Sequence, residues 1–207
     1  MEVTLTENST HIVIDRGELR FNFKPQVKRI SLEEFEKICC DNRDMQIEMD
    51  KEGDVIIMPP VHSETSEKNS EIVYQLKHWS KTDKRGKVYE SSGGFVLPNG
   101  AIRAPDASWI LKERLENLSD EERQGFIKIC PDFVIELRSA SDSLPKLKAK
   151  MSEYLENGAE LGWLIDAGKK KVYVYRQNKP VEVLENPKSL SGENILVKFT
   201  LDLTQIF

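Results

Sequence analysis

The segment Phe133–Leu137 (FVIEL) constrains this chain more than any other, because it is almost entirely apolar and yet contains one acid. Its length and its β-branched residues are typical of a strand that is buried on both faces of a sheet. A carboxylate in such a strand costs several kcal/mol unless it pairs with a cation or binds a metal ion. Glu136 is therefore the first candidate for a functional residue.

A second acid, Asp106, follows Pro105 and precedes the apolar segment Ala107–Ile110. Two acids on neighbouring central strands can point to one place, and Mg²⁺ is often held by one or two carboxylates while it keeps waters for the substrate. A structural role is also open, because either acid can cap a helix, accept a hydrogen bond from a loop amide or pair with Arg103 or Arg138. The spacing alone does not decide between these interpretations.

A helix is expected from about Pro145 to Asn157, because proline suits a first helical turn and Gly158 suits the position after the end. Lys150 lies at the edge of its apolar face, from which the ammonium can reach back towards Glu136. The alternative is a solvated lysine whose methylene groups lie along the apolar surface. The apolar face consists of Leu147, Met151, Tyr154 and Leu155.

The rest of the chain alternates between helices and strands without a long linker or an internal repeat, which favours one mixed α/β domain. Residues 1–30 are expected to form an arm with one strand at Thr10–Ile14. Further helices are expected over residues 32–41 and 65–81 and at the capping box that begins at Ser119. Strands are expected at 46–49, 55–58, 88–97 (one strand or two), 102–111, 161–166 and 171–175.

Composition excludes several classes of protein. The 207 residues contain 35 acids and 30 bases, giving a formal net charge of −5, which argues against coating nucleic acid by bulk positive charge and leaves a local basic groove open. No apolar stretch is long enough for a membrane span, and the N-terminus lacks signal-peptide features, so a cytoplasmic location is expected. The three cysteines and three histidines show no zinc-binding spacing.

Taken together, Asp106 and the segment from Pro131 to Asp142 resemble the PD-(D/E)XK phosphodiesterase signature. The chain is more closely similar to the Uma-two family of predicted restriction endonucleases, over roughly residues 30–185. The further matching segments are 53–60 (GDVIIMPP), 94–100 (GFVLPNG), 150–154 (KMSEY), 157–159 (NGA), 161–166 (LGWLID) and 172–176 (VYVYR).

This resemblance implies an α/β fold with a restriction endonuclease-like core, in which a central mixed β-sheet is flanked by helices. It implies that Asp106 and Glu136 bind Mg²⁺ or Mn²⁺ and that the substrate is DNA. The family signature usually places a lysine two residues after the glutamate, where this chain has Arg138. Arginine does not deprotonate and is a poor general base, so Lys150 becomes the matching catalytic cation.

The resemblance also suggests an acid from the helix before the sheet, for which Glu71 is the candidate. A phosphate-facing rim is expected from the cations at 103, 138, 146 and 148, and a homodimer is expected because nucleases of this class often pair to cut two strands. The expected domains are an N-terminal arm (1–30), a restriction endonuclease-like domain (31–185) and a C-terminal extension packed on it (186–207).

Three functions remain open from the sequence. The first is a metal-dependent DNA endonuclease that uses Asp106, Glu136 and Lys150. The second is a nuclease fold that has lost cleavage and serves as a binding or regulatory module, which Arg138 in the lysine position favours. The third is an unrelated α/β binding protein in which the two acids only satisfy backbone amides.

Overall fold

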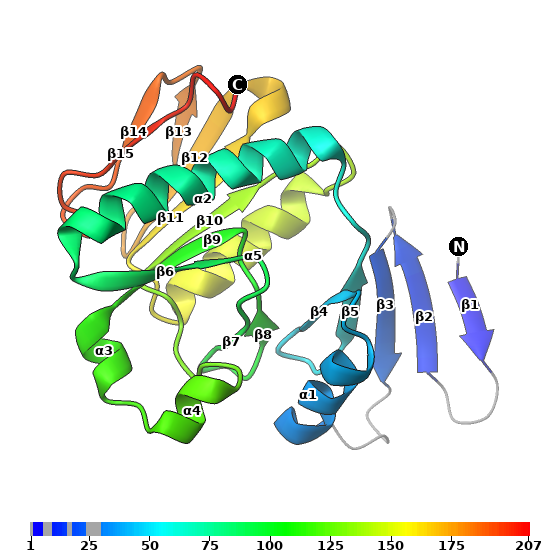
Figure 1. The fold of residues 1–207 in the computed structure, drawn as a ribbon. Helices are drawn as coiled ribbons and strands as arrows, with labels where there is room; N and C mark the ends of the chain where they lie inside the picture. Colours follow the sequence, from blue (N-terminus) through cyan, green and yellow to red (C-terminus); the bar gives the residue numbers. More distant parts are fainter. Residues whose placement is uncertain (1, 6–9, 16–17, 24–29) are drawn as a thin grey trace.

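The computed structural model describes residues 2–5, 10–15, 18–23 and 30–207 (Figure 1). The longest helices begin close to the predicted positions, and both capping boxes, at Ser31 and Ser119, are formed. The helices are α1 (Leu32–Asp41), α2 (Ser63–Asp83), α3 (Lys112–Glu116), α4 (Asp120–Gln124), α5 (Leu144–Glu156) and the 3₁₀ helix η1 (Ala167–Lys169).

A six-stranded sheet forms the centre of the fold. Its strand β10 pairs in parallel with β11 and antiparallel with β9, so the sheet is mixed, as predicted. In spatial order its strands are β13 (Glu182–Glu185), β12 (Lys171–Arg176), β11 (Leu161–Asp166), β10 (Phe133–Leu137), β9 (Ala107–Leu111) and β6 (Gly86–Glu90).

Helices cover both faces of this sheet, and the alternation of side chains along β10 assigns each residue to one of them. Phe133 and Ile135 pack in the same core cluster as Ile72 and Leu76 of α2. Val134 packs in a second cluster with residues of α5. Because successive side chains in a strand point to opposite faces, Glu136 shares the face of Val134 and points towards α5. All five residues of β10 are buried, as predicted.

Helix α5 packs against the sheet at Gly162 of β11. A Cβ atom at Gly162 would lie 2.5 Å from Cε of Met151 and 3.3 Å from Cγ2 of Val134, so the Met151 side chain occupies the space that a larger residue would need. Lys150 precedes Met151 on this helix.

A seven-stranded sheet lies beside the central one (Figure 1). Residues 1–30 were expected to supply one strand, but they supply three, and β3 pairs antiparallel with β5. Residues 1, 6–9, 16–17 and 24–29 of the expected arm lie outside the described residues, and the division at residue 30 stays a prediction. In spatial order the strands are β1 (Glu2–Leu5), β2 (Thr10–Asp15), β3 (Glu18–Phe23), β5 (Val55–Met58), β4 (Gln46–Met49), β8 (Ile102–Arg103) and β7 (Phe95–Val96).

The segment 102–111, predicted as one strand, is divided between the two sheets. Strand β8 ends at Arg103 in the seven-stranded sheet, and β9 begins at Ala107 in the central sheet. Pro105 lies in the gap, where its missing N–H cannot interrupt a ladder. The break places Asp106 where the chain passes from one sheet to the other.

The C-terminal residues form a small sheet of β14 (Ser189–Ser191) and β15 (Thr200–Asp202), which lies beside α2 (Figure 1). Phe199 and Leu201 join the core cluster under α2. Trp109 and Trp163 are buried in the same cluster, and Trp79 packs against it. Among the described residues, no helix has both the length and the apolar character needed to cross a membrane.

Candidate active site

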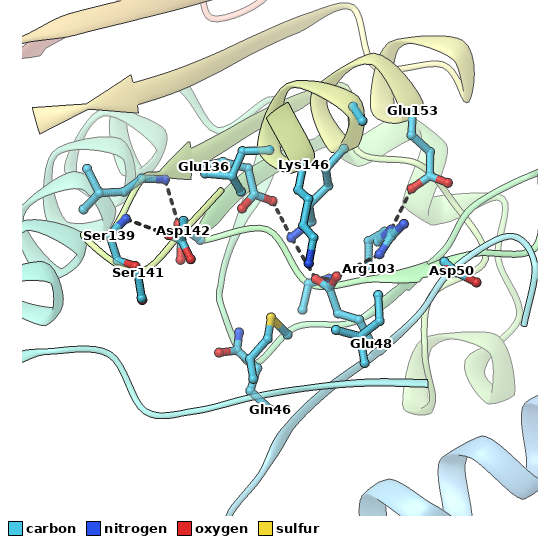
Figure 2. A pocket seen from close by; sticks show the side chains of 18 of the residues that line it. Gln46, Glu48, Asp50, Arg103, Glu136, Ser139, Ser141, Asp142, Lys146 and Glu153 are labelled. Carbon is cyan, nitrogen blue, oxygen red and sulfur yellow. Dashed lines mark hydrogen bonds and ion pairs between the residues drawn. The ribbon is translucent and has the colours of Figure 1, made fainter. Parts of the chain in front are cut away.

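A cavity of about 560 Å³ lies between helix α5, the end of β10 and the β4–β5 hairpin of the second sheet (Figure 2). Asp106, Glu136 and Lys150, the three residues singled out in the sequence, all line it. They come from the β8–β9 connection, from β10 and from α5 respectively. The fold therefore brings the three together, while their catalytic role stays a prediction.

The Lys150 ammonium lies between two carboxylates. Its Nζ is 2.8 Å from Oε1 of Glu136 and 2.8 Å from Oε1 of Glu48, and its side chain is 13% exposed. Burial alone would lower the pKa of Lys150, but the adjacent Glu136 and Glu48 carboxylates outweigh burial and raise that pKa above its usual value. Lys150 is therefore a permanent cation at neutral pH.

Glu136 is a buried carboxyl group with an unusual proton affinity. Burial raises its pKa to about 7, the Lys150 ammonium opposes this rise, and the negative charges of Asp106 and Glu48 add to it. The phenol of Tyr154 donates a hydrogen bond to Oε1 of Glu136 at 3.0 Å. Near neutral pH this group is therefore balanced between its protonated form and its ionised form.

Asp106 is held by two hydrogen bonds. Its Oδ2 accepts from the backbone N–H of Leu137 at 2.7 Å, and its Oδ1 accepts from Nδ2 of Asn69 in α2 at 3.1 Å. The sequence left open a bond from Asp106 to a loop amide, but the donor here is Leu137, the last residue of strand β10. Burial nevertheless raises the pKa of Asp106. Oδ1 of Asn69 is buried and has no hydrogen-bond partner in the described part of the chain.

Glu48 is a site residue that the sequence reasoning missed. Its side chain is only 3% exposed, and from β4 of the second sheet its Oε1 lies 2.8 Å from Nζ of Lys150. The available signal was an acid within the predicted strand 46–49. Glu71, the acid expected here, does not line the cavity, and its Oε1 accepts from Gln75 on the same helix. The side chain of Gln75 is bonded in turn to the backbone of Asp202, so this part of α2 is linked to the C-terminal residues.

Arg103 lines the cavity, but its guanidinium is buried and pairs with two acids instead of forming part of an open rim. Its Nη1 donates to Oε2 of Glu48 at 3.1 Å, and its Nε donates to Oε2 of Glu153 at 2.6 Å. Both bonds join charged groups that are almost inaccessible to solvent, and such bonds are short and strong. Arg103 thus ties β8 to β4 and to α5.

The rest of the expected phosphate-facing rim is incomplete. Arg138 does not line the cavity, because its Nη1 forms an ion pair with Asp166 at 2.6 Å. Lys148 lies over the ring of Tyr173, 4.2 Å from its centroid. Lys146 does line the cavity. Core partners thus hold two of the four cations away from it.

The cavity is acidic, contrary to the expected local basic groove. Its lining contains eight carboxylates and four cationic groups, so its formal charge is −4 when all of them are ionised. Such a cavity attracts cations and repels phosphates until cations enter. The acids are Glu48, Asp50, Glu52, Asp106, Glu136, Asp142, Glu153 and Glu156, and the cations are Lys51, Arg103, Lys146 and Lys150.

The residues present fit a hard divalent cation with few protein ligands. Within the described ranges, no group of three or more His, Cys, Asp or Glu side chains is arranged to hold a metal ion. Asp106 and Glu136 supply two carboxylates, and Mg²⁺ is commonly bound by one or two carboxylates together with waters and substrate phosphates. The raised pKa values of both groups mean that the site favours an added positive charge, which a proton or a metal ion can supply.

Comparison with known proteins supports the sequence resemblance. Residues 32–204 match the model of the Uma2 family, which is described as "Putative restriction endonuclease". Among solved structures, a protein from Anabaena variabilis described as "a putative nuclease belonging to DUF820" is similar, with a TM-score of 0.66 and 25% sequence identity. The match covers 78% of this chain and 89% of that one. No curated protein matches. Because the family model covers most of its length, the chain belongs to the Uma2 family.

Proposed function

We propose that the protein is a metal-dependent endonuclease that hydrolyses DNA phosphodiester bonds in the cavity at the end of β10. One observation carries the proposal: the half-buried carboxyl group of Asp106 and the buried one of Glu136 line the same cavity as the Lys150 ammonium, which lies 2.8 Å from Glu136. Burying charged groups lowers the stability of the folded protein, and such groups with shifted pKa values are typical of functional sites. Membership of the Uma2 family supports a nuclease, with DNA as the substrate class.

Asp106 and Glu136 would hold Mg²⁺ or Mn²⁺. When bound, such an ion supplies Lewis acidity, which activates water and neutralises the charge that develops on the phosphate. Asn69 and the Leu137 amide fix the orientation of Asp106. Lys150 stabilises negative charge on the phosphate as a fixed cation, and its raised pKa makes it a hydrogen-bond donor rather than a base.

Plasmid nicking tests this proposal directly. With supercoiled DNA and Mg²⁺ or Mn²⁺, the protein is expected to produce nicked and then linear plasmid, and an excess of EDTA is expected to stop the reaction. Cleavage is expected to require a metal ion because the acidic cavity repels phosphates until bound cations offset its negative charge. Metal and DNA binding without cleavage would favour the catalytically inactive module. Absence of both metal binding and cleavage would overturn the proposal.

Metal affinity is expected to rise with pH. The pKa of Glu136 is raised to about 7, so its proton competes with the metal ion below that pH and leaves above it. Calorimetric titration with Mn²⁺ should give about tenfold tighter binding at pH 8 than at pH 6, with proton release on binding at the lower pH. Equal affinity at the two pH values would show that Glu136 is not a ligand.

A further inference from the structure

Glu48 is held by three donors from two different parts of the fold. Its Oε1 accepts from the Ala104 backbone N–H at 3.0 Å and lies 2.8 Å from Nζ of Lys150. Its Oε2 accepts from Nη1 of Arg103 at 3.1 Å. Because both carboxylate oxygens are occupied and the side chain is buried, Glu48 has one well-defined position.

These contacts form a closed ring that begins and ends on α5. Lys150 contacts Glu48, Glu48 contacts Arg103, and Arg103 contacts Glu153, which lies three residues after Lys150 on the same helix. Figure 2 shows Glu48, Arg103 and Glu153 on one side of the cavity. The ring fixes β4 against α5 and leaves Lys150 as its member nearest to Glu136.

The two carboxylate partners of Lys150 differ in whether they can still attract its ammonium once a metal ion is bound. A divalent cation on Glu136 would repel an ammonium that lies 2.8 Å from the same carboxylate. Glu48 would then be the remaining anion in contact with Lys150. Without that anion, the long and flexible lysine side chain would be free to turn away from the cavity.

We propose that Glu48 is a positioning residue that keeps the Lys150 ammonium in the cavity while a divalent cation occupies Glu136. This inference rests on the proposed function of the cavity. It gives a β4 residue, contributed by the second sheet, a role in a site whose other members lie in the β8–β9 connection, β10 and α5.

Kinetics of Glu48→Gln test this role, because the substitution keeps the size of the side chain and removes its charge. The expected result is a 10–100-fold fall in kcat for plasmid nicking, with KM for DNA and Mn²⁺ affinity changed less than threefold. Glu48→Asp, which keeps the charge, is expected to retain a higher kcat than Glu48→Gln. The exposed Glu160→Gln is the control and should behave like the wild type.

A double-mutant cycle separates positioning from other roles. In a Lys150→Met background, Glu48→Gln is expected to cause no further loss of kcat, because no ammonium remains to be held. Fully additive losses would overturn the proposal, and so would a large fall in Mn²⁺ affinity, which would identify Glu48 as a metal ligand.

Nuclear magnetic resonance of ¹⁵N-lysine-labelled protein gives a readout that does not depend on cleavage. A protected ammonium signal, assigned by its absence from Lys150→Met, is expected to persist in the wild type with Mg²⁺ and to disappear in Glu48→Gln with Mg²⁺. Persistence of that signal in Glu48→Gln would overturn the positioning role alone. A wild type that neither binds Mg²⁺ nor cleaves DNA would instead overturn the proposed function on which this role rests.

Discussion

Replacing Glu136 with glutamine is expected to lower the rate of metal-dependent plasmid nicking by about 10³-fold, since losing a metal ligand removes several kcal/mol of transition-state stabilisation. Glutamine has nearly the same shape and still offers an oxygen to the phenol of Tyr154, which donates to Oε1 in the wild type. Lys150 keeps its contact with Glu48. The variant should therefore fold and lose only the anionic oxygens that bind the ion.

Measurements of stability and of metal binding distinguish a lost metal ligand from a misfolded variant. Because the pKa of Glu136 is raised by burial and by the neighbouring acids, its ionised form is unfavourable in the absence of metal. Above pH 7, the free energy of unfolding of Glu136→Gln should therefore equal or exceed that of the wild type. Calorimetry should show weakened Mn²⁺ binding, and Glu160→Gln should nick at the wild-type rate. Equal nicking by Glu136→Gln and the wild type would remove Glu136 from the active site.

The sequence predicted the central part of the site because the relevant signals are local. The apolar run Phe133–Leu137 gives β10 directly, and the apolar spacing of α5 places Lys150 at the edge of its buried face. The convergence of both with Asp106 needs only that β9 and β10 are neighbours, which the register confirms by pairing Ala107 with Ile135. Such patterns extend over a few residues, so they can be recognised without knowledge of contacts between distant segments.

The partners of the buried cations could not be predicted, because they depend on contacts between distant segments. Arg103 was predicted to lie on a phosphate-facing rim, but it pairs with Glu48 and Glu153. These partners are 55 and 50 residues away from it along the sequence. Arg138 was assigned to the same rim and pairs instead with Asp166. No periodicity within one element indicates which acid a buried arginine will meet.

The second sheet explains why Glu48 was missed although its hairpin was predicted. The pairing of Gln46–Met49 with Val55–Met58 is confirmed, yet nothing in the hairpin indicates which sheet it joins. The Glu48 side chain reaches the cavity because its strand, β4, also pairs with β8 at Met49 and Ile102. This pairing brings the β8–β9 connection and α5 beside β4.

A local signal did exist for the division of residues 102–111, since Pro105 disfavours a continuous central strand.

Replacing Arg103 with methionine is expected to lower the free energy of unfolding by about 3–5 kcal/mol, the usual effect of removing one partner from a buried charged group. The guanidinium lies between Glu48 and Glu153 and is about 9% exposed. Methionine fills similar volume but leaves Glu153 without its cation and Glu48 with Lys150 as its remaining ion-pair partner. Urea unfolding followed by circular dichroism measures the loss.

The charge explanation for this destabilisation has its own test. Arg123→Met removes an arginine whose partner is exposed and 3.8 Å away, so it should cost less than about 1 kcal/mol. Adding Glu48→Gln and Glu153→Gln to Arg103→Met should recover much of the lost stability, because no uncompensated buried charge then remains. The deficit of Arg103→Met should also shrink at acid pH, where protonation neutralises Glu48, whose pKa Lys150 and Arg103 hold below its usual value in the wild type against the effect of burial. If the combined variant were no more stable than Arg103→Met, the arginine would act through packing, and the ring that links Lys150 to the second sheet would not depend on its charge.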